Sequence, residues 1–343
     1  MSIAATPVHP SDHPRRRFTG ALAVLAQRRE YGLLVLVAAI VLFTGLANPA
    51  FFSPGNVQDT LVSFVPEAIV SCGMLLVIAT GEIDISVGGL MSLLAAMLGL
   101  LASPTHANMP VWLVIMLTLL AGIAVGFLNG ILVAVAGIPS IIVTLGMYTA
   151  LPAVTNMLMH GQYVTDVPPA LRFWGSGTFL TIPISLWTTA VVALCAMFLA
   201  WRTALGRRIF AVGSNPHAAR LAGVSIVWTK IFVFTLSGFL VGIATLVTAT
   251  QLSVIEPGTG QSLALAVVTC VVVGGASISG GRGTIPGALL GVCLLGLVRG
   301  VLIFLKLGQH AIYWEHAIQG ALILAAVLVD HLASRRLGGE GHA

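Results

Sequence analysis

Two carboxylates interrupt a long apolar stretch, within residues 81–89, whose sequence is GEIDISVGG. The glycines and Ser86 predict that one helix ends here and another begins, with Asp84 or Ser86 as the capping residue. If the flanking runs cross a membrane, a charged carboxylate at that depth costs several kcal/mol unless it is paired or hydrated. Glu82 and Asp84 are therefore candidates for binding an ion or for guiding a solute.

This segment has a simpler interpretation, in which it is a cytoplasmic turn between two helices and its acids are solvated. If instead it lines a transport path, the path is mostly apolar with a few hydroxyl and amide groups, which suits a neutral polar solute. The candidate path residues are Glu82, Asp84, Ser86, Asn129, Thr144, Asn156 and Gln162. The uncharged members of this set could also simply bond neighbouring helices.

No catalytic or nucleotide-binding motif accompanies the segment. The glycine cluster 274–283 lacks the Lys and the Ser or Thr that a phosphate-binding loop places after its last glycine, because Arg282 and Gly283 stand there. HExxH, GxSxG and CxxC motifs do not occur. The four cysteines all fall in apolar runs, at Cys72, Cys195, Cys270 and Cys293. The sequence therefore predicts a chain that is not an enzyme, with no cofactor, no metal site and no ATP site of its own.

The composition is that of an integral membrane protein. Apolar residues make up 57% of the chain and charged residues only 8%, where a soluble domain has roughly a quarter. The mean hydropathy is +1.02. Residues 85–165 contain no Asp, Glu, Lys or Arg, which leaves room for several spans of about 20 residues. The net charge of +5 then reflects membrane topology and gives no reason to expect nucleic-acid binding.

The apolar runs predict an all-α protein with about ten transmembrane helices. The predicted spans are residues 31–47, 61–80, 90–102, 111–136, 140–160, 184–201, 231–250, 263–274, 286–304 and 314–329. Residues 1–30 are expected to form a cytoplasmic tail, residues 31–331 the transmembrane domain, and residues 332–343 a second cytoplasmic tail. Within span four, Gly122, Gly126 and Gly130 recur every four residues, which favours close packing on another helix.

The basic residues indicate the orientation in the membrane. Six predicted spans precede the polar loop 202–230 and four follow it, so this loop and both termini lie on one side. Of the 16 Lys and Arg residues, all except Arg172, Arg299 and Lys306 fall on that side. Because basic residues collect in cytoplasmic loops, we expect that side to face the cytoplasm.

The second glycine cluster resembles the first. GEIDISVGG at 81–89 has a shorter counterpart, GASISGG, at 275–281, and each stands between two apolar runs. This similarity indicates an internal repeat with broken helices, which in transporters often places a site between the halves. A chance match of Ile, Ser and Gly is the alternative.

The loop 202–230 contains a short helix with caps at both ends. Asn215 is a good N-cap, Pro216 suits the first helical position, and Gly223 suits the stop, so a helix is expected over 216–222. A helix of about seven residues does not persist alone in water and needs a partner surface. The candidate docking residues are Gly206, Asn215, Ala218, Ala219, Arg220 and Gly223. The alternative is a plain connecting loop.

Four motifs in order resemble a known family. These are residues 81–89, PSIIVTLGM at 139–147, the loop 206–223, and VVVGGASISGGRGT at 271–284. They look like the permease subunits of bacterial ABC sugar importers of the ribose, xylose, rhamnose and autoinducer-2 type, over about residues 51–330. The chain departs from the pattern of this family at two places, and both bear on which solute it would carry. Glu82 stands where the family usually has a small residue, and residues 261–263 lack an acid that the family often has there.

The resemblance implies the partners and the activity. It implies two ATP-binding subunits, or one with two nucleotide-binding halves, a second permease copy or paralogue, and a periplasmic solute-binding protein. All of them would assemble at the lipid bilayer of a bacterial inner membrane. The chain would then import a monosaccharide or a similar small polar solute. The alternatives are an ion-coupled secondary transporter that uses Glu82 and Asp84, and a branched-chain amino-acid permease of the ABC class.

Overall fold

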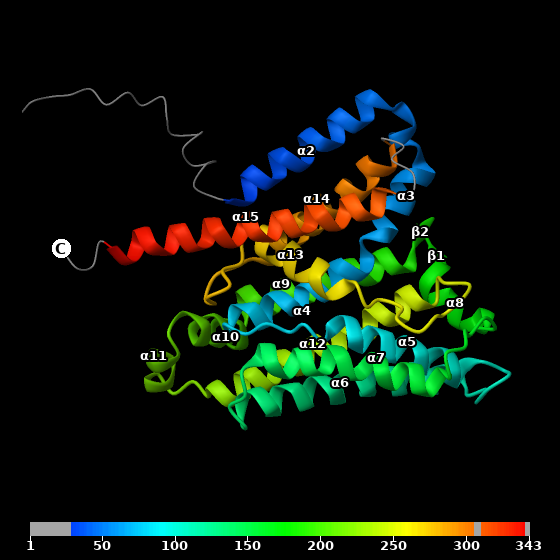
Figure 1. Cartoon of the computed structure of the whole chain (residues 1–343), viewed down its shortest axis with the longest axis horizontal. Coiled ribbons are helices and arrows are strands. Elements are labelled where there is room, and N and C mark those ends of the chain that lie inside the picture. Colours follow the sequence, from blue (N-terminus) through cyan, green and yellow to red (C-terminus); the bar gives the residue numbers. More distant parts are fainter. Residues whose placement is uncertain (1–28, 305–309, 340–343) are drawn as a thin grey trace, which may run out of the picture.

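The computed structural model describes residues 29–304 and 310–339 (Figure 1). The long helices lie roughly side by side along one axis, with α10 (Ala204–Ser214) and α11 (Pro216–Leu221) at one end of the bundle. The opposite end carries a hairpin of two-residue strands, β1 (Thr178–Phe179) and β2 (Ile182–Pro183). We call these the α10–α11 end and the hairpin end. The predicted tail 1–30 lies almost wholly outside the described residues, as does Lys306.

Every predicted span coincides with a helix in the described part of the chain. The other elements are α2 (Arg29–Ala47), η2 (Pro49–Phe52), α3 (Pro54–Ser63), α4 (Val65–Ala79), α5 (Val87–Ala102), α6 (Val111–Ala134), α7 (Ser140–Met159), α8 (Pro169–Ser176), α9 (Ile184–Arg202), α12 (Ile226–Ala249), α13 (Leu263–Val273), α14 (Ile285–Phe304) and α15 (Ala311–Gly339). Since α12 begins at Ile226, the polar loop is shorter than the predicted 202–230. At the other terminus α15 continues ten residues past Val329, the predicted end of span ten.

The all-helical polytopic architecture is confirmed. Within residues 29–304 and 310–339, seven helical segments are long and apolar enough to cross a membrane, and α3 and α4 together form one of them. By contrast α5 has 16 residues and α13 has 11, fewer than the roughly 20 that a crossing helix needs. Both short helices follow unwound segments, so the count of ten complete spans stays a prediction.

Two helices form the centre of the bundle. In an apolar 18-residue stretch of each segment, 72% of the residues are buried in α3–α4 and 67% in α12, against 22% in α6 and in α9 and 28% in α7. The peripheral helices therefore present apolar side chains outward, as a lipid-facing surface does. The predicted glycine face of α6 packs on α12: a Cβ at Gly126 would lie 2.4 Å from the carbonyl oxygen of Phe234, and one at Gly122 would lie 2.5 Å from that of Gly238.

Candidate functional site

The first predicted break is present and lies inside the bundle. α4 ends at Ala79, and residues 82–84 have no regular structure before α5 begins at Val87. Asp84 is only 2% exposed and bonds Ser237, which stands half-way along α12. The alternative of a turn with solvated acids is therefore wrong for Asp84.

The capping of α5 differs from the prediction. Ser86 occupies the N-cap position, but its side chain makes no capping hydrogen bond. Instead Oδ1 of Asp84 accepts hydrogen bonds from the backbone N (3.0 Å) and from Oγ (2.6 Å) of Ser86. The carboxylate thus holds the turn that leads into the helix, because an Asp side chain can bond the backbone two residues on.

Two other helices complete a buried polar cluster around Asp84. Oγ of Ser237 in α12 donates to Oδ2 of Asp84 at 3.3 Å, and Nδ2 of Asn129 in α6 donates to Oγ of Ser86 at 2.9 Å. All four side chains are buried. Polar groups inside an apolar bundle need such partners. The cluster therefore attaches the unwound segment to both α6 and α12.

The backbone of the unwound segment is bonded by α7. The N–H of Ile83 donates to Oγ of Ser140 at 3.2 Å, and Oγ1 of Thr144 donates to the carbonyl oxygen of Ile83 at 3.3 Å. Unwound backbone at membrane depth needs partners of this kind because lipid provides none. The structure thus brings together Asp84, Ser86, Asn129 and Thr144 of the predicted path residues.

The remaining three predicted path residues behave differently. Glu82 forms an ion pair with Lys230 near the start of α12, and both side chains are half-buried. Asn156 is exposed and bonds the carbonyl oxygen of Pro152 within α7. Gln162 is also exposed, beyond the end of α7 at the hairpin end. Asn156 and Gln162 therefore do not belong to the break, because α7 carries them away from it.

A second unwound segment was missed by sequence reasoning. Residues 251–262 lie between α12 and α13 and reach inward alongside α5, where the N–H of Gly258 donates to Oγ of Ser92 at 3.1 Å. A Cβ at Gly88 would lie 2.5 Å from the carbonyl oxygen of Gln261, so the first turns of α5 and α13 touch. The signal available in the sequence was the turn chemistry of Pro257, Gly258 and Gly260.

The predicted second break, 274–283, meets the first one at the α10–α11 end. The N–H of Gly281 donates to the carbonyl oxygen of Ala79 at 2.9 Å. Gly213 of α10 fills the space between them, since a Cβ there would lie 1.9 Å from the Ala79 oxygen and 2.6 Å from the Gly281 nitrogen. A Cβ at Gly280 would lie 2.8 Å from the nitrogen of Gly81. We call this contact of α10 with both breaks the glycine junction.

The caps predicted around α11 are confirmed. Oδ1 of Asn215 accepts the N–H of Ala218 at 2.9 Å, and Pro216 is the first helical residue. At the other end Gly223 has φ +78, its N–H bonds the carbonyl oxygen of Arg220, and the next N–H bonds that of Ala219. These two bonds form the usual glycine-terminated helix end. The helix is one residue shorter than predicted.

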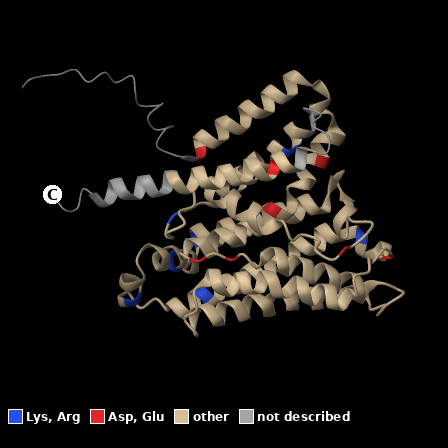
Figure 2. Ribbon diagram, in the orientation of Figure 1, with Lys and Arg blue, Asp and Glu red and all other residues tan. Residues whose placement is uncertain are grey.

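Two of the predicted docking residues face the chain itself. Ala219 is 5% exposed, and Gly206 is buried where a Cβ would lie 2.3 Å from the carbonyl oxygen of Leu199. The prediction that Ala219 seats in a partner groove is therefore wrong, because the side of a short helix that faces inward is set by tertiary packing. Ala218 and Arg220 are exposed, and so is Leu221. Figure 2 shows basic residues gathered at this end.

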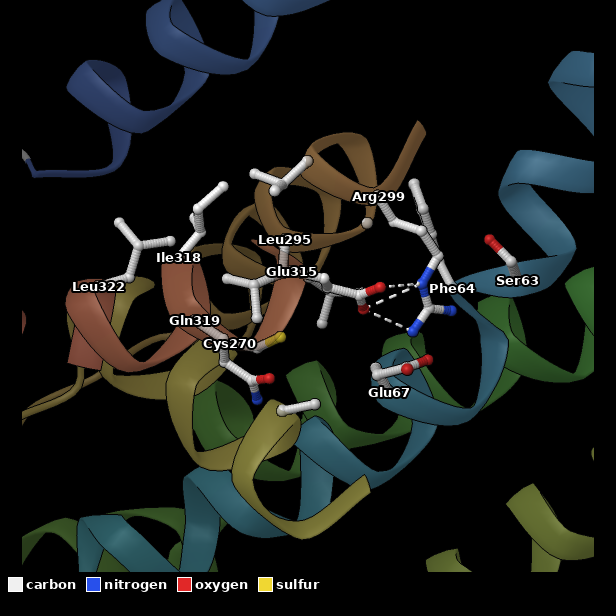
Figure 3. Close-up of a pocket in the computed structure, with 14 residues that line it drawn as sticks. Ser63, Phe64, Glu67, Cys270, Leu295, Arg299, Glu315, Ile318, Gln319 and Leu322 are labelled. Carbon is white, nitrogen blue, oxygen red and sulfur yellow. Dashed lines mark hydrogen bonds and ion pairs between the residues drawn. The ribbon is translucent and has the colours of Figure 1, made fainter. Parts of the chain in front are cut away.

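A pocket that contains charged side chains lies towards the hairpin end, between α4, α13, α14 and α15 (Figure 3). Nε and Nη2 of Arg299 donate to the carboxylate of Glu315 over 2.7–3.1 Å. Glu67 and Gln319 line the same pocket. Sequence reasoning did not select these residues, although Glu67, Arg299 and Glu315 are charges inside or beside predicted spans, which was the available signal.

Comparison with known proteins agrees with this architecture. Residues 56–327 match the family described as "Branched-chain amino acid transport system / permease component". The ribose import permease RbsC of Haemophilus influenzae is 33% identical over 318 residues, which cover 91% of this chain and 96% of the relative. The L-arabinose ABC transporter permease AraH of Azospirillum brasilense is 32% identical and covers 96% of each chain. The autoinducer 2 import permease LsrC of Salmonella typhi is 30% identical over 90% of this chain and 87% of its own.

Two of these relatives are named as import permeases and the third as an ABC transporter permease. The helical bundle with two unwound segments is consistent with that role. The match covers most of the described chain, including both breaks and the α10–α11 end. The chain therefore belongs to this family of ABC import permeases.

Proposed function

We propose that this chain is the membrane-spanning subunit of an ATP-driven importer and that its solute is a monosaccharide or a similar small polar molecule. The relatives named for ribose, L-arabinose and autoinducer 2 support the class of solute. A mostly apolar interior with a few hydroxyl and amide groups suits a neutral solute. The pairing of Glu82 with Lys230 argues against the ion-coupled alternative, because that carboxylate already has a counter-charge.

The observation that best supports the mechanism is the glycine junction. α10 and α11 stand at one end of the bundle, and Gly213 of α10 contacts both breaks through main-chain atoms. A displacement of α11 is therefore transmitted to both breaks at once. The exposed side chains of Ala218, Arg220 and Leu221 form the surface on which an ATP-binding subunit docks.

Basic residues at the same end of the molecule support an orientation in the membrane, and the family supports the partners. The exposed Arg202, Arg207, Arg208 and Arg220 lie there, and basic residues mark the cytoplasmic side. The α10–α11 end and both termini then face the cytoplasm. The full importer contains two ATP-binding subunits, or one with two nucleotide-binding halves, a second permease copy or paralogue, and a periplasmic solute-binding protein. The chain itself hydrolyses no ATP.

Uptake into proteoliposomes tests this proposal. The permease is reconstituted with its ATP-binding subunit and binding protein, and uptake of D-ribose, L-arabinose and L-leucine is compared. We expect sugar uptake that requires ATP and persists when an ionophore collapses ion gradients. Uptake that stops with the ionophore while ATP remains would favour a secondary transporter, and uptake of leucine alone would favour an amino-acid permease.

A further inference from the structure

An ion pair between α14 and α15 forms one side of the pocket in Figure 3. Two nitrogens of Arg299 hold both carboxylate oxygens of Glu315 at 2.7–3.1 Å, which is a planar two-point interaction. This pairing joins α14 to α15. Two further polar side chains of the pocket, Glu67 from α4 and Gln319 from α15, are not part of this ion pair.

Two buried atoms of this pocket lack a hydrogen-bond partner among the described residues. They are Oε2 of Glu67 and Nε2 of Gln319. A buried polar atom without a partner destabilises a protein, so such an atom marks a place where a ligand or an ordered water belongs. A carboxylate oxygen needs a donor, whereas an amide nitrogen needs an acceptor. A hydroxyl group is both a donor and an acceptor, so it can pair with either atom.

Size and charge narrow the choice of ligand. The cavity measures about 40 Å³, which admits a hydroxyl or hydroxymethyl group but not a whole solute. The pocket contains two carboxylates for one guanidinium, so an anion is disfavoured. An ammonium group would donate to Glu67 but would leave the amide nitrogen of Gln319 unpaired. A neutral hydroxyl group fits best.

The pocket is accessible to water or to another chain. Arg299 stands five residues before the end of α14, and its side chain is 48% exposed. A charged group at membrane depth faces water or protein and not lipid. A solute that arrives from the hairpin end can therefore reach the pocket with one of its hydroxyl groups.

We propose that Glu67 and Gln319 form a subsite that recognises one hydroxyl group of the imported sugar at the hairpin end of the permease. This inference rests on the proposed function, and it specifies a contact that the helix break does not supply.

Monodeoxy analogues of the transported sugar test the subsite. A hydrogen bond to a charged group contributes roughly 10- to 100-fold in binding. In the wild-type reconstituted importer we expect one analogue, lacking the recognised hydroxyl, to be taken up with a kcat/KM about 10- to 100-fold below that of the parent sugar. In Glu67→Met, which removes the acceptor at similar volume, this discrimination should fall to nearly onefold. Gln319→Met should reduce discrimination against the same analogue. This variant replaces Glu67→Met as the test if Glu67→Met does not fold.

The matched control is Asp59→Asn, which neutralises an exposed acid on the neighbouring helix α3 and should keep the wild-type discrimination. If the wild type imports a sugar and the variants keep the discrimination, with or without slower uptake, the pocket holds ordered water only and the subsite is refuted. If the wild type imports leucine and no sugar, the proposed function itself fails. The two failures are thus distinct.

Discussion

Gly213→Ala tests whether the glycine junction transmits motion from α10 to the breaks. The added Cβ would lie 1.9 Å from the carbonyl oxygen of Ala79, about 1.5 Å closer than an ordinary contact of 3.4 Å. Overpacking of this kind costs about 1–3 kcal/mol. Because the clash is with backbone, it cannot be relieved by a rotamer change, and α10 must move away from both breaks. An energy of 1–3 kcal/mol changes the balance between two conformations by roughly 5- to 150-fold.

The assay measures solute imported per ATP hydrolysed in proteoliposomes, together with the melting temperature of the detergent-solubilised complex. We expect the Gly213→Ala complex to assemble and to hydrolyse ATP while uptake per ATP falls at least fivefold. Gly32→Ala is the control, since no atom lies within 4 Å of the Cβ position at Gly32. Normal coupling in Gly213→Ala would refute the role of the junction, and a parallel loss of uptake and hydrolysis at reduced stability would show that Gly213 is needed only for folding.

Other substitutions address the remaining contacts. Asp84→Ala should lower the melting temperature of the complex, because it removes three hydrogen bonds worth about 1 kcal/mol each. Asp84→Asn keeps an acceptor and should lower the melting temperature less. If both variants lose uptake equally while their stability is unchanged, the charge itself is needed. Glu82→Gln or Lys230→Gln should each reduce uptake, and the double exchange Glu82→Lys with Lys230→Glu should restore part of it; no recovery would count against a role for the pair. Ala219→Trp should destabilise the permease alone, measured by its melting temperature without partners, because Ala219 is buried in this chain. Hydrogen bonds from Thr105 and Ser103 lower the pKa of Asp166, so these contacts should persist at neutral pH and be lost only as the pH falls through that lowered pKa. Hydrogen exchange of the backbone amides of residues 103–106 measures this loss. Loss of protection already between pH 5 and 7 would contradict the prediction.

Local sequence chemistry predicted much of this structure. The apolar runs located the helices, since length and hydropathy alone define a membrane-crossing segment. The caps at Asn215 and Gly223 were predictable because each depends on a few neighbouring backbone groups. The break at 81–86 was predictable from its glycines and acids for the same reason.

Features that depend on distant contacts were not predictable. Glu82 pairs with a lysine 148 residues away, and the Glu67 pocket joins four helices spread from α4 to α15. The inward orientation of Ala219 depends on how α11 packs, which its own six residues do not specify. The second unwound segment, 251–262, was missed because its turn residues also suit an ordinary loop between two complete spans.

The contact between the first turns of α5 and α13 has an electrical consequence for the membrane. The N-terminus of a helix is equivalent to roughly half a positive elementary charge, and two such ends meet where Gly88 approaches Gln261. Together they supply about one positive charge inside the bundle, and the N-terminus of α5 lies beside Asp84, whose Oδ1 accepts the N–H of Ser86. Two positive helix ends at this contact disfavour a passing cation and leave a neutral solute unaffected. A neutral solute could then cross without a current, and import would leave the membrane potential intact.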